Sequence, residues 1–172
     1  MFYRILKEFF LKKVVSKGLL GYKLEDSEDK IKTIGILVDE SESFNREAIL
    51  KELKSYNLDL ETIDVLVFKE KIKAKEVIEE PFYTLKDLSL SGKVNKVEVQ
   101  KFIDANFDLL INFYEEPKAS LNVIAKKSKA KFKVGLSTID KRINHLIIDS
   151  DLENVKVFTS ELIKYLRILN KV

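Results

Sequence analysis

The chain contains no cysteine and only one histidine, His145, among its 172 residues. The absence of cysteine excludes disulfides, thiolate metal sites, iron–sulfur clusters and a cysteine nucleophile. One histidine is too few for the zinc and iron sites that take two or three imidazoles from one chain. A metal would need carboxylate ligands, which favours magnesium, manganese or calcium. A chain without cysteine suits the reducing cytosol, so we expect a cytoplasmic protein, with peripheral contact at the inner membrane as an alternative.

Glycine and proline are also scarce, with five and two residues respectively. Such a shortage of turn residues predicts long regular elements joined by short loops. Hydrophobic residues make up 45% of the chain and charged residues 34%, which is typical of a single globular domain. The longest apolar run near the N-terminus is Phe9-Phe10-Leu11. This run is too short for a signal peptide or a membrane span, so we expect neither in this segment.

Apolar segments rich in β-branched residues alternate along the chain with segments of helical periodicity. The strands are expected at residues 31–38, 63–68, 108–113, 131–136 and 145–149, and the helices at 45–56, 96–105, 116–127 and 151–170. Residues 71–80 are a further candidate helix, and 82–84 a candidate short edge strand. This alternation predicts an α/β fold with a doubly wound, mainly parallel five-stranded sheet of Rossmann-like or flavodoxin-like type.

The first residues form a separate segment in this interpretation. Residues 1–24 hold six basic side chains and one acidic one, and within them residues 2–15 have the spacing of an amphipathic helix. Its apolar stripe comprises Phe2, Ile5, Leu6, Phe9 and Phe10. Residues 25–30 are predicted to be a polar linker to the α/β domain, residues 31–172. So many aromatic side chains must be buried on the protein's own sheet, on a membrane or on a partner.

Sequence motifs for catalysis or nucleotide binding are missing. The loop after the first strand, Asp39 to Phe44, contains three acids and no glycine, so it cannot cradle a pyrophosphate. No Walker motif and no Gly-x-Ser-x-Gly elbow is present, and His145 lies beside an apolar strand where a structural histidine is expected. The sequence therefore favours a binding domain without catalytic activity and without a cofactor.

Carboxylates follow three of the predicted strands. Asp39, Glu115 and Asp149 would lie at the edge of a parallel sheet where ligands usually bind. If they converge, they form a site for Mg²⁺ or a similar divalent ion, and the protein is a metal-dependent enzyme. The alternative is that acids in these loops cap the helices that follow.

Two groups of residues are candidates for partner binding. One is on the N-terminal helix and comprises Phe2, Phe9, Phe10, Lys12 and Lys13. The other is the lysine-rich corner with Lys126, Lys127 and Lys129, which can either bind phosphates or simply be solvated. Together they predict docking on a protein or ribonucleoprotein assembly, with attachment to a membrane surface as an alternative. Nothing in the sequence points to specific DNA binding.

Two stretches, Phe107-Asp-Leu-Leu-Ile-Asn-Phe-Tyr-Glu-Glu-Pro117 and Ser128-Lys-Ala-Lys-Phe-Lys-Val-Gly-Leu136, resemble a family of uncharacterised proteins from Bacteroidota. The resemblance extends over nearly the whole chain, including the aromatic N-terminal helix. It implies no activity and no catalytic residues.

Overall fold

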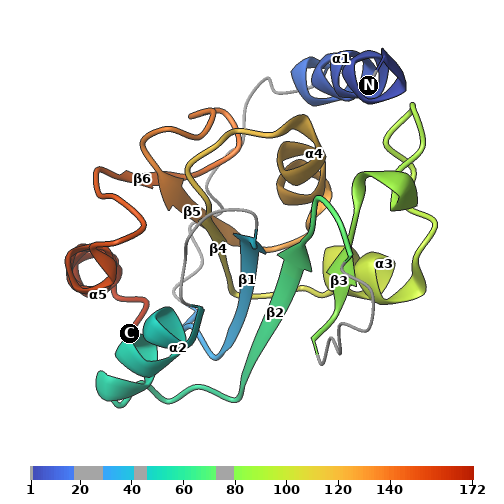
Figure 1. Ribbon diagram of the computed structural model, residues 1–172. Coiled ribbons are helices and arrows are strands. Elements are labelled where there is room, and N and C mark those ends of the chain that lie inside the picture. Colours follow the sequence, from blue (N-terminus) through green and yellow to red (C-terminus); the bar gives the residue numbers. More distant parts are fainter. Residues whose placement is uncertain (1, 18–28, 41–45, 73–79) are drawn as a thin grey trace.

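A computed structural model describes residues 2–17, 29–40, 46–72 and 80–172 (Figure 1). In these residues the protein has an α/β fold with a six-stranded sheet in the order β3-β2-β1-β4-β5-β6. Every strand pair in the sheet is parallel. The strand order reverses between β1 and β4, which is where doubly wound sheets place their ligands.

The helices and strands have the following bounds. The strands are β1 (Thr33–Asp39), β2 (Thr62–Phe68), β3 (Phe82–Tyr83), β4 (Leu109–Phe113), β5 (Phe132–Leu136) and β6 (Leu146–Ile148). The helices are α1 (Phe2–Ser16), α2 (Arg46–Ser55), α3 (Val97–Asp104), α4 (Ala119–Lys127) and α5 (Val155–Ile168), with a short 3₁₀ helix, η1 (Leu85–Asp87).

Helices cover both faces of the sheet, as parallel strands require. Helices α2 and α5 lie against each other on one face, and α3 and α4 cover the other (Figure 1). Strands β4 and β5 are buried along their whole length, and each contains one buried polar side chain, Asn112 in β4 and Lys133 in β5. Helix α1 is an additional element, which packs on α4 on the side away from α2 and α5 (Figure 1).

The predicted fold class is confirmed at the level of an α/β protein with a parallel sheet, and two details differ. Within the described residues the sheet has six strands instead of five, because the candidate edge strand at 82–84 forms as β3 and pairs with the end of β2. Helix α4 begins at Ala119, not at Glu116, because Lys118 has extended backbone angles and is the N-cap residue. The candidate helix at 71–80 and the linker at 25–30 lie largely outside the described residues.

Asp108 joins the amino ends of the two central strands. Its carboxylate accepts hydrogen bonds from the backbone N–H groups of Lys32 and Thr33, at 3.1 and 3.0 Å, and pairs with Lys131 at 2.9 Å. Partial burial alone would raise the pKa of Asp108, but these hydrogen bonds outweigh it and lower the pKa to about 2. The amino ends of β1 and β4 are therefore held together by a carboxylate that stays ionised.

Candidate functional site

The inner face of α1 attaches this helix to the rest of the protein. Leu11 is fully buried and Val15 is 6% exposed. Near the start of α4, the Glu8 carboxylate accepts a hydrogen bond from the Ala119 N–H at 3.1 Å. Near the end of α4, the Lys126 ammonium donates to the Val14 and Val15 carbonyls, at 2.8 and 3.0 Å, and to that of Lys17. Helices α1 and α4 thus run side by side in the same direction, and hydrogen bonds connect both ends of α4 to α1.

The outer face of α1 carries the apolar stripe that the sequence predicts. Ile5 is 63% exposed, Phe9 52%, Phe10 39% and Leu6 37%. The ring centroids of Phe9 and Phe10 lie 5.9 Å apart, and the Lys13 ammonium lies 4.6 Å from that of Phe9. The side chain of Phe2, also predicted to bind a partner, is outside the described part. The helix is therefore packed on its own domain and still presents its aromatic residues to solvent.

The lysine-rich corner has mostly internal partners. Lys126 holds the end of α1, and Lys129 pairs with Asp104 at 2.7 Å. Lys133 is fully buried, and its ammonium donates to the Ala125 carbonyl at 2.8 Å. Burial lowers the pKa of Lys133 to about 8. Lys127 is exposed, so of the three lysines predicted to bind a partner only Lys127 and Lys129 lie at the surface.

The three strand-end carboxylates are engaged separately. Asp39 pairs with Lys118 at 2.6 Å, Glu115 accepts the Leu152 N–H at 2.7 Å, and Asp149 accepts the Ser137 hydroxyl at 2.8 Å. Within the described ranges, no group of three or more acidic or histidine side chains is close enough to hold a metal ion. The predicted convergence of these carboxylates on a divalent cation is therefore not found.

The position where the strand order reverses is filled by an ion-pair network centred on Lys118. Besides Asp39, its ammonium lies 3.2 Å from Glu70 and 3.3 Å from Glu116, and Glu70 also binds Arg4 of α1 at 2.8 Å. Burial alone would lower the pKa of Lys118, but the hydrogen bond and charge of Asp39 outweigh it and raise the pKa. Burial likewise opposes ionisation of Glu70, yet its hydrogen bonds from Arg4 and Lys118 lower its pKa.

A cleft of about 600 Å³ lies beside this network, between the first two turns of α1, the end of β2 and η1. Its apolar lining includes Tyr3, Phe68, Ile72 and Leu85. Its charged lining includes Arg4, Lys7, Lys71, Lys86 and Lys118 as well as Glu8 and Glu70. The volume is within the range of small-molecule sites in proteins. The cleft depends on α1, so sequence periodicity within the α/β domain gives no sign of it.

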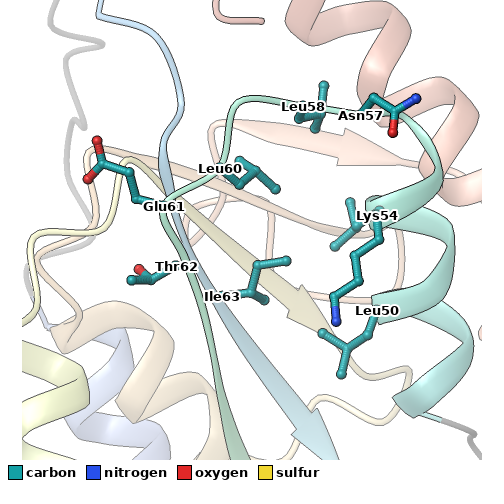
Figure 2. A pocket seen from close by; sticks show the side chains of 9 residues that line it. Leu50, Lys54, Asn57, Leu58, Leu60, Glu61, Thr62 and Ile63 are labelled. Carbon is teal, nitrogen blue, oxygen red and sulfur yellow. The ribbon is translucent and has the colours of Figure 1, made fainter.

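A second hollow, of about 460 Å³, lies at the amino ends of the strands, between α2 and the start of β2. Figure 2 shows Leu60 and Ile63 extending toward α2, while Glu61 points away from it. Leu50 and Lys54 of α2 line the other side. Ligands of parallel α/β sheets bind at the carboxyl ends of the strands, so this hollow at the amino end is a weaker candidate.

The contacts of His145 indicate a structural role. Its Nδ1 accepts the Lys133 N–H at 2.9 Å, and its ring stacks on Phe132 with centroids 5.4 Å apart. Burial lowers the pKa of His145, which keeps Nδ1 free of a proton and able to accept this bond. The chain's single imidazole is therefore engaged in holding β5.

Fold and site together define an α/β protein with a parallel sheet, whose strand-reversal point is closed by ion pairs and flanked by a docked N-terminal helix. Residues 7–169 match a family of unknown function, DUF6913. The chain belongs to this family, which confirms the resemblance to uncharacterised proteins. Searches of the curated proteins and of the solved structures gave no significant match. No helix of the described parts is long and apolar enough to cross a membrane.

Proposed function

We propose that this protein is a Rossmann-like, non-catalytic cytoplasmic domain that docks on a larger protein or ribonucleoprotein assembly through the outer face of α1. The observation that carries the proposal is the orientation of this helix. Leu11 and Val15 fix it to the domain, while Ile5, Phe9 and Phe10 stay exposed. A helix that presents aromatic residues on a fixed scaffold has little ordering entropy to lose when a partner binds.

The charges beside this apolar face indicate the kind of partner. Lys12 and Lys13 of α1 are exposed, and so is Lys17 directly after the helix. Exposed aromatic residues flanked by lysines complement an apolar groove with an acidic rim. The partner is therefore expected to bind the two phenylalanines in such a groove and to pair its carboxylates or phosphates with the lysines.

The test compares proteins captured from a lysate by the wild type and by the double variant Phe9→Ser/Phe10→Ser. Val157→Ser/Ile168→Ser is the matched control, because both residues are exposed apolar side chains on α5, at 49% and 65%. We expect one protein or ribonucleoprotein complex to be lost from the phenylalanine variant and kept by the control. With that complex purified, Lys12→Glu/Lys13→Glu should weaken binding about tenfold or more at low salt.

Two outcomes would contradict the proposal. Capture that is equal for the wild type and both variants would exclude the outer face of α1 as the docking surface. Salt-sensitive flotation of the wild type with phosphatidylglycerol vesicles, lost in the phenylalanine variant, would assign the face to a membrane surface instead. Treatment of the captured complex with RNase separates a protein contact from an RNA contact.

A further inference from the structure

The cleft between α1, β2 and η1 contains a charged group that the fold does not explain. Lys7 is only 3% exposed, and it lines this cleft. Among the described residues, the one partner of its ammonium is the ring of Tyr3, whose centroid lies 5.5 Å away. A buried ammonium without a carboxylate partner is costly, and natural proteins keep such groups mainly where they serve binding or catalysis.

The acids in the same cleft are already engaged. Glu8 accepts the Ala119 N–H, and Glu70 binds both Arg4 and Lys118. Burial raises the pKa of Glu8, and the hydrogen bond to Ala119 opposes this effect. Among the described residues of the cleft, neither Glu8 nor Glu70 forms an ion pair with Lys7. The cleft thus offers Lys7 for an additional anion.

The remaining lining of the cleft is suited to an apolar body. Tyr3 and Phe68 contribute aromatic rings, and Ile72 and Leu85 contribute aliphatic side chains. Lys71 and Lys86, which lie outside the core, add positive charge at the rim. Apolar walls with few convergent polar groups are typical of small-molecule sites.

From this geometry we infer that the cleft binds a small molecule with an apolar or aromatic body and one anionic group, and that Lys7 binds the anionic group. This site is separate from the outer face of α1, since Lys7 lies on the inner side of the helix. It therefore stands or falls independently of the proposed docking function.

The test uses anilinonaphthalene sulfonate, a fluorescent probe that joins aromatic rings to an anion. Lys7→Met keeps the buried stem of the side chain and removes the charge. We expect this substitution to weaken binding of the probe about tenfold or more, as for loss of a charge-assisted hydrogen bond. Lys101→Met, an exposed lysine on α3, is the control and should leave the affinity unchanged within about twofold.

Two further measurements make the result specific. N-phenylnaphthylamine has the same rings without the sulfonate, so it should bind the wild type and Lys7→Met equally. Lys7→Met should also raise the melting temperature of the free protein, because it removes a buried charge that has no carboxylate partner among the described residues. Displacement of the probe by benzoate or by adenosine monophosphate supports the inference and shows whether the anionic group is a carboxylate or a phosphate.

The inference is wrong if Lys7→Met leaves the affinity for the probe unchanged, or if it lowers the melting temperature, since the ammonium then has a structural partner. It is equally wrong if Phe9→Ser/Phe10→Ser removes probe binding, because the probe then lies on the outer face of α1. That last result would leave the docking proposal intact.

Discussion

The two faces of α1 use side chains in opposite ways. The inner face combines two buried apolar residues, Leu11 and Val15, with Lys7 and Glu8, and it is joined to α4 by hydrogen bonds. The outer face carries the more apolar stripe, yet that stripe is exposed. The comparison teaches that the apolar side of a helix is not always its packed side. Hydrogen bonds to the ends of a neighbouring helix can determine the orientation instead.

The largest expected effect comes from replacing one leucine by alanine on each face of α1 and comparing the losses in stability. Leu11→Ala on the inner face should lower the free energy of unfolding by about 3 kcal/mol, because it leaves a cavity at a fully buried position. Leu6→Ala on the outer face should cost less than about 1 kcal/mol, since Leu6 is 37% exposed. Urea unfolding measures both. Equal losses would mean that the two faces are packed alike.

The ion pairs beside the inner face should contribute nearly as much. Asp39→Asn leaves the buried Lys118 charge with weaker partners and should cost about 3 kcal/mol, as for other broken buried pairs. Adding Lys118→Met should recover part of this loss, because both charges are then gone. Denaturant unfolding of the single and double variants tests this coupling. Strictly additive losses would show that the pair is not coupled.

Lys133, buried beneath α4, should make the free energy of unfolding change with pH in the alkaline range. Its pKa is about 8 in the folded protein, against 10.5 for an unperturbed lysine in an unfolded chain. Between these values the unfolded chain binds more protons, so stability rises with pH. The gain from about pH 7.5 to about pH 9.5 should be about 2 kcal/mol. Lys133→Met should abolish this gain, and an unchanged pH profile in the variant would contradict the assignment.

The smallest effect concerns the contact of α1 with the start of α4. Glu8→Ala removes the hydrogen bond to the Ala119 N–H and should cost about 1 kcal/mol at neutral pH. Glu8→Gln keeps an acceptor and removes a carboxylate whose pKa burial raises. Because the pKa of Glu8 is higher in the folded protein than in the unfolded chain, the ionised carboxylate destabilises the folded state above the unfolded pKa. Glu8→Gln removes this cost, so it should not be destabilising. Thermal unfolding distinguishes the two variants, and a larger loss for Gln than for Ala would overturn this account.

The elements of the fold were largely predictable from the sequence, because buried parallel strands such as Leu109–Phe113 are mostly apolar. The presence of a helix near the N-terminus was predictable as well. Its packed face was not, since that depends on Glu8 meeting Ala119, 111 residues away. The network at the strand-reversal point was missed for the same reason, because Lys118 and Asp39 are 79 residues apart. Local periodicity carries no information about such pairs.

The parallel alignment of α1 with α4 has a consequence for folding during synthesis. A chain emerges from the ribosome N-terminus first, so α1 is complete long before the residues that receive it. Leu11 and Val15 have no α4 to pack against until residues Ala119–Lys127 have been made. Until then the apolar side chains of both faces are open to solvent, so the helix gains no stability from tertiary packing before α4 has been made.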